Sequence, residues 1–329
     1  MRNMTNLEYS FLVAELAPLV TGKHFDRIRK ISDGIYRIKI ANLEILCELG
    51  VRIHLTKYIE PTEQTDKFVE KVAKELDNAK LREIRQVNRD RIILFDFDTA
   101  QLVFEMFGDG NAILVKDGVT VVATKYESWT GREIKPNQPY SPPKNVPAEK
   151  LELTDKYVIV SLMKLPLGKD YVAEALIRSK IEEKKPGSSL SESERKKLEQ
   201  ELVKIKSEVQ PVVFYENQKV IDFGLALFSK YSKFTVQKFK SLGEAADEYF
   251  SKVEKPNPKL EKLLSRLEKQ QERLQILMEE EKEFKTQGDL VYANYAKIDA
   301  LLQLAKAGKF DELAKFKLDK KEKSLELVF

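Results

Sequence analysis

"RIILFDFDTAQLVFEMFGDGNAILVKDGVTVVATK", residues 91–125, is a series of short apolar runs separated by turn residues. Each run is rich in valine, isoleucine, leucine and phenylalanine and is too short for a helix of average length. Asp117-Gly118 is typical of the tight turns that join antiparallel strands. We therefore predict an antiparallel meander over this segment.

The preceding residues add helices and a further set of short strands. A helix is predicted near the start of the chain, where Thr5 and Glu8 are spaced as a capping box. Alternating runs follow Gly22 as "GIYRIKIAN", "LEILCELG" and "VRIHLTKY", and helical spacing returns over residues 65–80. The predicted fold class is α+β with a mainly antiparallel sheet.

A proline-rich stretch ends the first part of this sheet domain, which we place at residues 1–150. The stretch, "IKPNQPYSPPKNVPAEK", is stiff and lacks backbone donors at its prolines. Residues 151–210 are predicted to be a helical insertion, because strand signals and then a helix return over residues 211–253. Residues 211–253 are therefore the second part of the sheet domain.

The insertion contains "LPLGKDYVAEAL", in which a turn at Gly168 leads directly into a helix. This form is similar to a helix-hairpin-helix unit, whose free N–H groups at a helix N-terminus can bind a nucleic-acid phosphate. Gly168 and Lys169 are therefore candidate phosphate-binding residues. An ordinary helical connector explains the same residues equally well, because a single glycine stands where the usual hairpin has two.

Residues 254–308 are predicted to form coiled-coil helices. Leucines and Phe284 lie on one stripe of a long helical pattern, and charged residues occupy its other faces. Gly288 is predicted to interrupt the first helix, with a second helix after it. Residues 309–329 suggest a terminal hairpin whose last strand has no continuation, so we expect a truncated chain.

Composition and motifs argue against several classes of protein. The chain has 329 residues, 42% hydrophobic and 33% charged, and no stretch approaches the roughly 18 to 20 apolar residues of a membrane span. Cys47 and the two histidines make no zinc-ligand set, and no phosphate-binding glycine loop or nucleophile elbow occurs. We predict a soluble cytoplasmic protein with no metal, cofactor, membrane contact or small-molecule substrate, and not an enzyme.

The strand that begins in "QVNRDRIILFDF", residues 86–97, opens with the charged residues Arg89, Asp90 and Arg91. Basic residues outnumber acidic ones from Lys80 to Arg91, and "GKHFDRIRK" forms a second basic cluster. Such clusters either bind nucleic-acid phosphates or form a solvated edge. The net charge of +4 does not decide between these alternatives.

Several stretches, taken in order, resemble the NFACT family of ribosome-associated quality-control factors, some of which are known as fibronectin-binding proteins. They are "MTNLEYSFLVAEL", "GKHFDRI", "RIHLT", "QVNRDRIILFDF", "FGDGNAILVKDG", "YSPP", "LPLGKDYVAEAL" and "QGDLVYANY". The resemblance implies an N-terminal fragment of an archaeal member, with an NFACT-N domain, an inserted helix-hairpin-helix unit and the start of a coiled coil.

The activity implied by the resemblance is binding to a large ribosomal subunit, with its rRNA, that is obstructed by peptidyl-tRNA. The protein would recruit tRNA, chiefly alanyl-tRNA, for untemplated addition of residues to the stalled chain, and the ribosome would make the peptide bond. In the family an Asp-Arg pair needed for tRNA binding maps onto Asp90 and Arg91, and an acidic residue of the first helix maps onto Glu8. Arg52, in "RIHLT", and Arg89 complete the candidate tRNA-binding set.

Two other functions stay open. The general plan resembles the formamidopyrimidine-DNA glycosylases, repair enzymes that use an N-terminal proline and an adjacent glutamate, where this chain has Met1 and Arg2 and lacks the zinc cysteines. The other alternative is an interaction module, in which the coiled coil docks a partner and the basic clusters are solvated. Binding of tRNA, and its fall with added salt, would separate a tRNA-binding protein from such a module.

Overall fold

The computed structural model describes residues 2–58, 64–144, 146–253 and 258–313. The chain divides into two compact units, Met1–Glu254 and Lys255–Phe329. In the described part of the first unit, helices accompany strands whose pairings are antiparallel. The predicted α+β class is therefore confirmed.

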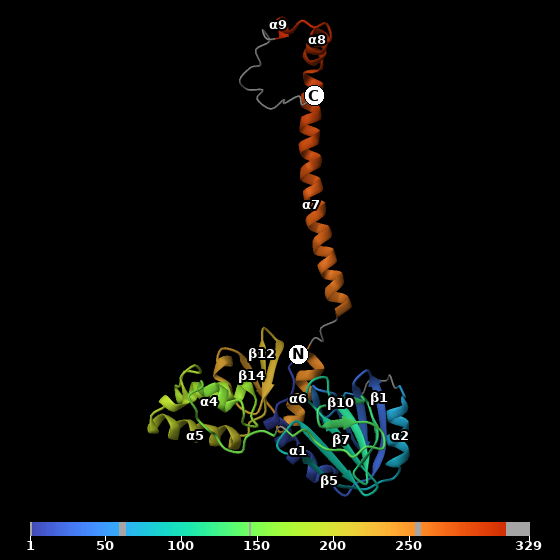
Figure 1. The fold of residues 1–329 in the computed structure, drawn as a ribbon, viewed down its shortest axis with the longest axis vertical. Coiled ribbons are helices and arrows are strands. Elements are labelled where there is room, and N and C mark those ends of the chain that lie inside the picture. The colour runs from blue at the N-terminus through green and yellow to red at the C-terminus, as the bar shows by residue number, and fades with distance from the viewer. Residues whose placement is uncertain (1, 59–63, 145, 254–257, 314–329) are drawn as a thin grey trace. The chain divides into compact units, whose positions relative to one another are not determined.

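Two meanders form much of the first unit (Figure 1). One is a four-stranded sheet in the order β1-β2-β3-β4, and the other a five-stranded sheet in the order β5-β6-β7-β8-β9. The first has the bounds β1 Phe25–Ser32, β2 Ile35–Ile40, β3 Leu43–Glu48 and β4 Arg52–Leu55. The second has the bounds β5 Leu81–Gln86, β6 Ile92–Phe97, β7 Gln101–Glu105, β8 Asn111–Lys116 and β9 Val119–Ala123. The segment 91–125 thus forms the meander predicted from its apolar runs.

The antiparallel strands of the first unit are divided between separate sheets. Helix α2 (Lys67–Glu75) lies between the meanders in the sequence and packs against β1 and β9, so that its buried face is covered by both sheets. Near the start of β5, Leu81 donates its N–H to the carbonyl of Lys23 at 2.8 Å, and His24 bridges to Lys80. The two basic clusters, one in residues 22–30 and the other in residues 80–91, are separate in the sequence. In the structure their first residues therefore lie on neighbouring backbone segments.

Helix α1 (Asn6–Val20) begins at the capping box predicted for it. Thr5 Oγ1 accepts the N–H of Glu8 at 3.3 Å, and Glu8 Oε2 accepts the N–H of Thr5 at 2.8 Å. These hydrogen bonds satisfy N–H groups that have no partner within the helix. The start of α1 is thus defined by its own sequence.

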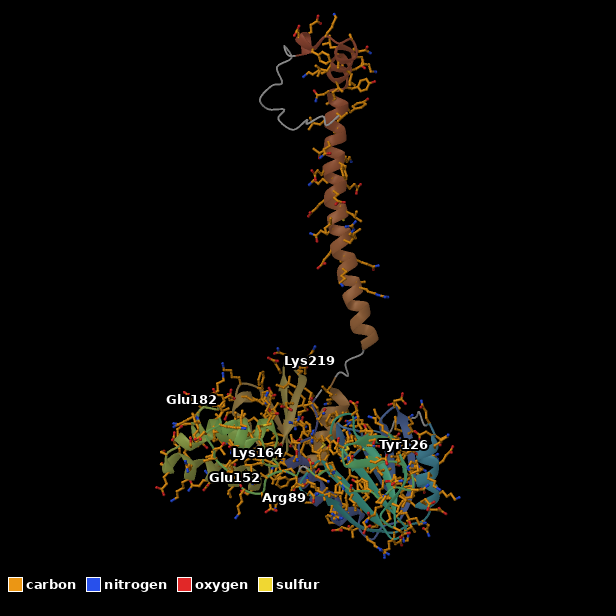
Figure 2. The ribbon with its side chains drawn as sticks, in the orientation of Figure 1. Arg89, Tyr126, Glu152, Lys164, Glu182 and Lys219 are labelled. Atoms are coloured by element: carbon orange, nitrogen blue, oxygen red, sulfur yellow. The ribbon has the colours of Figure 1, made fainter. Side chains whose placement is uncertain are left out.

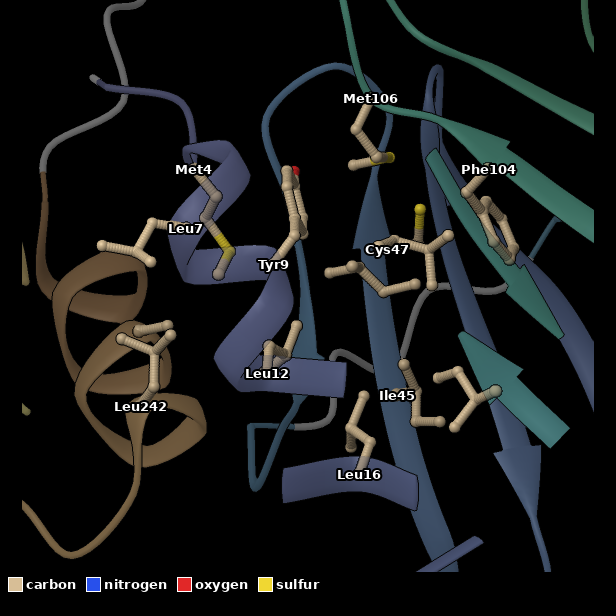
Figure 3. Close-up of a cluster of buried hydrophobic side chains, with 14 of the residues drawn as sticks. Met4, Leu7, Tyr9, Leu12, Leu16, Ile45, Cys47, Phe104, Met106 and Leu242 are labelled. Carbon is tan, nitrogen blue, oxygen red and sulfur yellow. The ribbon is translucent and has the colours of Figure 1, made fainter. Parts of the chain in front are cut away.

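Buried leucines place α1 between other elements of the core (Figure 3). Leu7 points toward Leu242, the first residue of α6 (Leu242–Lys252), while Leu16 lies on the side of Ile45 in β3. Glu15 adds a polar contact, because its carboxylate accepts the N–H of Leu242 at 2.7 Å. Helices α1 and α6 therefore pack together with the sheets at their side.

Residues 151–210 hold helices α3 (Val158–Leu162), α4 (Lys169–Ser179) and α5 (Glu192–Ser207). The strands that follow form a three-stranded sheet in the order β13-β12-β14. Figure 1 shows α4 and α5, in green to yellow, across α1 and α6 from the two meanders. The bounds are β12 Val212–Glu216, β13 Lys219–Gly224 and β14 Thr235–Lys238, with a separate hairpin of β10 Glu127–Trp129 and β11 Arg132–Ile134.

The second unit contains α7 (Pro258–Ala293), α8 (Tyr295–Lys306) and α9 (Phe310–Leu313). The predicted interruption at Gly288 is wrong, because α7 continues through it and ends before Asn294. A glycine in a helix costs only about 1 kcal/mol relative to alanine, and nothing lies within 4 Å of where its Cβ would stand. Residues 314–329, most of the predicted terminal hairpin, lie outside the described residues. No helix in the described ranges combines the length and apolar character needed to cross a membrane.

Candidate nucleic-acid interface

The turn between β5 and β6, residues 87–91, carries the consecutive charged residues and is called the Asp90 turn below. Asn88 and Arg89 have left-handed backbones, with φ of 54° and 55°, which an arginine rarely adopts. The Asp90 N–H donates to the Val87 carbonyl at 2.9 Å, and the Arg91 N–H donates to Asp90 Oδ1 at 2.7 Å. The Asp90 carboxylate therefore helps to close its own turn.

Asn6, in the first turn of α1, forms hydrogen bonds with the Asp90 turn and with Gln86 beside it. Asn6 Nδ2 donates to the Arg89 carbonyl oxygen at 3.1 Å and to Asp90 Oδ1 at 3.2 Å. Gln86 Nε2 donates to the carbonyl oxygens of Asn6 and Asp90, at 2.9 and 2.8 Å. Arg89 remains exposed at the lower margin of the first unit in Figure 2, and Asp90 and Arg91 are half-buried.

The Arg91 guanidinium has no hydrogen-bond or ion-pair partner within the described ranges of the chain. The same holds for the Arg89 guanidinium, and the Arg89 charge acts on Lys206 near the end of α5. Burial, and then this positive charge, lower the pKa of Lys206. Cations that lack carboxylate partners are suited to binding an anion such as a phosphate.

Glu8 lies in the same turn of α1 as Asn6, but its side chain is fully buried, with 0% exposed. It pairs with the Arg2 guanidinium and accepts the hydroxyl of Tyr171 at 2.7 Å. Arg2 Nε also lies 3.0 Å from Asp222 Oδ1, on β13. These four residues, Arg2, Glu8, Tyr171 and Asp222, are called the Glu8 network below. They join α1, α4 and β13.

The electrostatics of the Glu8 network favour one protonation state. Burial and then the Glu8 charge raise the pKa of the Tyr171 hydroxyl well above its usual value, so Tyr171 stays protonated and donates. For Arg2, burial acts to lower the pKa, but Glu8 and Asp222 outweigh it and the pKa is raised. Arg2 therefore stays charged between its carboxylates.

The outer side of the Glu8 network adds exposed charges. Lys230 Nζ lies 2.7 Å from Asp170 Oδ1 and 3.5 Å from Asp222 Oδ2. Arg2 reaches Asp170 Oδ2 at 3.5 Å and lies over the ring of Phe223, 4.3 Å from its centre. Opposite charges thus alternate across the contact between the inserted helices and the rest of the first unit.

Gly168 lies at the N-cap of α4 and faces Thr5, the N-cap of α1. Its φ is +110°, and a Cβ built there would stand 2.5 Å from Thr5 Cγ2. The two helix starts therefore approach as closely as a glycine permits. Thr5 occupies space that a phosphate would need on this side, whereas Lys169 is exposed. The phosphate-binding role of Gly168 and Lys169 stays a prediction.

Arg52 is also directed inward and does not join the Asp90 turn. It is 5% exposed, its Nε lies 2.9 Å from Glu48 Oε2, and its guanidinium lies 4.4 Å from the ring centre of Phe250. Arg52 Nη1 donates to His54 Nε2 at 3.4 Å. Glu8 and Arg52 are therefore internal, while Asp90, Arg91 and Arg89 reach the surface.

His54, next to Arg52, gives the first unit a pH-dependent stability. Its Nδ1 lies 2.8 Å from the Leu55 carbonyl oxygen and 3.8 Å from Asp247 Oδ1. Burial, and then the charge of Arg52, lower its pKa from 6.5 to about 3, so the ring is neutral with its proton on Nδ1. Below pH 6.5 His54 becomes protonated in the unfolded chain, whereas in the folded chain it stays neutral until the pH falls to about 3.

We expect the stabilising effect of His54 to be complete above pH 6.5 and to be lost as the pH falls toward 3. The loss has a slope of up to about 1.4 kcal/mol per pH unit. Urea unfolding of the wild type and of His54→Gln, at pH 7, 6 and 5, measures this loss. The difference in unfolding free energy between the two proteins should become smaller as the pH falls. His24→Gln, at an exposed histidine, is the matched substitution. A His54→Gln difference that stays constant with pH would show that folding does not change the pKa of His54.

A cavity of about 590 Å³ adjoins the end of β7. Glu105, at that end, is 1% exposed, pairs with Arg132 and accepts the hydroxyl of Tyr140 at 2.9 Å. Arg132 lies 5.1 Å from the ring centre of the exposed Trp129. Glu105 is paired with the first residue of β6, so this cavity and the Asp90 turn lie at the same end of the sheet.

Comparison with known proteins identifies the family to which the chain belongs. The family model for the NFACT N-terminal and middle domains matches residues 8–323. The chain belongs to the NFACT family. The match includes Glu8, the Asp90 turn and most of the second unit, and it confirms the resemblance found in the sequence.

Curated relatives of this NFACT chain carry names from ribosome quality control. The archaeal Rqc2 homolog aRqcH of Methanocaldococcus jannaschii is 30% identical over 346 residues, covering 91% of this chain and 51% of the relative. The human ribosome quality control complex subunit NEMF is 22% identical, covering 92% of this chain and 34% of the relative. The chain thus spans about half the length of the archaeal relative and about a third of the human one.

Solved structures show that the NFACT fold is shared with bacterial proteins. The fibrinogen binding protein from Staphylococcus aureus is 15% identical with a TM-score of 0.60, covering 75% of this chain and 98% of that one. The N-terminal part of the fibronectin/fibrinogen-binding protein from Streptococcus suis is 19% identical with a TM-score of 0.60, covering 76% and 100%. At these identities the likeness concerns the fold alone.

The structure adds residues that sequence reasoning missed. Asn6 and Gln86 hold the Asp90 turn, and Arg2, Tyr171 and Asp222 surround Glu8. Asn6 and Gln86 stand inside stretches already singled out, but polar side chains at these places are common. The partners of Glu8 carry no local signal, because Tyr171 is 163 residues away from it.

Proposed function

We propose that this NFACT chain acts in ribosome-associated quality control. It binds large ribosomal subunits, through rRNA, that carry peptidyl-tRNA, and it recruits tRNA, chiefly alanyl-tRNA, for untemplated C-terminal addition to the stalled chain. The names of its archaeal and human relatives support the pathway. The work takes place in the cytoplasm, where ribosomes are.

One observation carries the tRNA-binding part of the proposal. The Asp90 turn contains Arg91, whose guanidinium has no hydrogen-bond or ion-pair partner in the described part of the chain, next in sequence to a carboxylate held by two hydrogen bonds. A guanidinium can donate two hydrogen bonds to a phosphate, and a held carboxylate can accept from a ribose hydroxyl or a base amine. Asp90 and Arg91 therefore make the direct contacts, and Arg89 adds charge.

Glu8 and Arg52 take no direct part in this proposal. Their buried side chains act on the fold around the interface. No residue of the chain is assigned a catalytic role, because the ribosome itself forms the peptide bond. The protein is thus a binding and recruiting factor.

We expect Arg91→Ala to weaken the binding of alanyl-tRNA to this chain by about tenfold to a hundredfold. That range corresponds to the loss of a charge-assisted hydrogen bond, and the slope of log affinity against log salt should fall by about 1. Fluorescence anisotropy with labelled tRNA at several salt concentrations measures both quantities. Arg91→Lys keeps the charge but loses the two-pronged geometry, so we expect an intermediate affinity with an unchanged salt slope.

The matched control is Lys219→Ala, which also removes one exposed positive charge. Lys219 and Arg89 lie at opposite margins of the first unit in Figure 2, so tRNA affinity should change by less than about twofold. Equal effects of Lys219→Ala and Arg91→Ala would indicate nonspecific attraction to the whole chain. Absence of tRNA binding by the wild type would favour the interaction module.

Asp90→Asn tests whether the carboxylate is more than a counter-ion. Asparagine keeps an oxygen at Oδ1, so the hydrogen bonds from Asn6 and from the Arg91 N–H can persist. A mere counter-ion repels phosphates, and removing its charge would strengthen tRNA binding. We expect the opposite, a loss of about tenfold at physiological salt with an unchanged melting temperature, because Asp90 accepts from the tRNA.

A further inference from the structure

The side chain of Asn6 contacts both the carboxylate and the backbone of the Asp90 turn. Its Nδ2 donates to Asp90 Oδ1 at 3.2 Å and to the Arg89 carbonyl at 3.1 Å. Asp90 Oδ1 also accepts the Arg91 N–H at 2.7 Å, so the same oxygen is held from two sides. The rotamer of Asp90 and the direction of its other oxygen, Oδ2, are set by these donors.

Asn6 is itself held in place by the elements around it. Its carbonyl accepts Gln86 Nε2 at 2.9 Å, and the capping box of α1 fixes the backbone on either side of it. Glu8, two residues on, is anchored by Arg2 and by Tyr171 of the inserted helices. The chain of contacts therefore runs from the Glu8 network through the first turn of α1 to Asp90.

We propose that Asn6 is a positioning residue for Asp90, and that the Glu8 network acts on the interface through Asn6. The left-handed backbone at Asn88 and Arg89 makes an outside support necessary, because arginine disfavours this conformation. The role connects the fully buried Glu8 to an exposed turn through the start of α1. This inference rests on the proposed tRNA binding for its purpose, and its first test does not involve tRNA.

Hydrogen exchange of the free chain tests the positioning directly. In Asn6→Ala the Arg91 amide should exchange about fivefold faster, because its acceptor, Asp90 Oδ1, is no longer held. Thr5→Ala is the matched control: it weakens the start of the same helix and leaves the donors to Asp90 in place. An Arg91 amide that exchanges at the wild-type rate in Asn6→Ala, or equally fast in both variants, overturns the proposal.

A charge substitution supplies the second test. Asn6→Asp places a carboxylate against Asp90 Oδ1 and should speed exchange of the Arg91 amide further than Asn6→Ala. In the background of Asp90→Ala the oxygen that faces residue 6 is absent, so adding Asn6→Asp should change the exchange rate of the Arg91 amide by less than about twofold. An equal acceleration by Asn6→Asp in both backgrounds would show that residues 6 and 90 do not act as a pair.

Affinity for alanyl-tRNA then shows whether positioning matters for binding. Asn6→Ala should weaken binding about fivefold alone but add nothing in the presence of Asp90→Ala, because both act through one carboxylate. Effects that multiply would overturn the coupling. If the wild-type chain binds no tRNA, the proposed function fails, and the exchange measurements still decide the role of Asn6.

Discussion

Glu8→Ala is expected to lower the free energy of unfolding of the first unit by about 3–5 kcal/mol, the cost of removing one partner from a buried ion pair. The substitution leaves Arg2 without its buried partner and leaves the Tyr171 hydroxyl without its acceptor. It also removes half of the capping box at Thr5. Urea unfolding followed by circular dichroism measures the change, with binding of tRNA as a second readout.

Glu70→Ala is the matched control for this result. Glu70 lies in the first turn of α2, as Glu8 lies in the first turn of α1, but it is exposed, so its loss should cost less than about 0.5 kcal/mol. In the double variant Arg2→Met/Glu8→Ala, part of the stability should return, because the buried guanidinium that lost Glu8 is removed. Asp222 then keeps Lys230 Nζ at 3.5 Å and the Tyr231 hydroxyl at 2.8 Å. Equal costs for Glu8→Ala and Glu70→Ala would mean that the Glu8 network does not stabilise the fold.

Gly168→Ala is expected to lower the free energy of unfolding by about 2–5 kcal/mol. The first part is backbone strain, because φ of +110° with ψ of 154° is open almost only to glycine. The second part is steric, because the new Cβ would stand 2.6 Å from Thr5 Cβ and 2.5 Å from Thr5 Cγ2. Both effects separate α4 from the start of α1.

Gly22→Ala separates the two contributions, because Gly22 also has a positive φ, +80°, but nothing within 4 Å of its Cβ position. It should cost only the strain, about 1–2 kcal/mol. Adding Thr5→Ser to Gly168→Ala removes the clashing methyl group, keeps the capping oxygen, and should recover part of the loss. If Gly168→Ala costs no more than Gly22→Ala, α4 and α1 do not approach as closely as described.

Local patterns in the sequence predicted the parts of the fold that depend on neighbouring residues. The capping box at Thr5 and Glu8 and the strands over residues 91–125 follow from spacing alone, and both are confirmed. The division of the strands into separate sheets could not be predicted, because the alternation of a strand says which face is buried but not which neighbour covers it. The interruption at Gly288 was wrong because a glycine weakens a helix without ending it.

The candidate site could be predicted only where one short stretch contains it. Asp90 and Arg91 adjoin in the sequence, and they adjoin at the surface. Glu8 was grouped with them only through the family resemblance, and the sequence gives no sign that it is buried or that Arg2 and Tyr171 enclose it. Such partners depend on how distant elements pack, which no local pattern carries.

The separation of the partners in the Glu8 network along the chain has a consequence for synthesis. Arg2 and Asp222 are made at widely separated times, and their ion pair can close only after β13 has left the ribosome. Contacts between such distant residues also form late in folding, because the entropy of closing so long a loop must be overcome first. The support behind Asn6 is therefore completed late, and a partly made chain would present an Asp90 turn without the support of the complete Glu8 network.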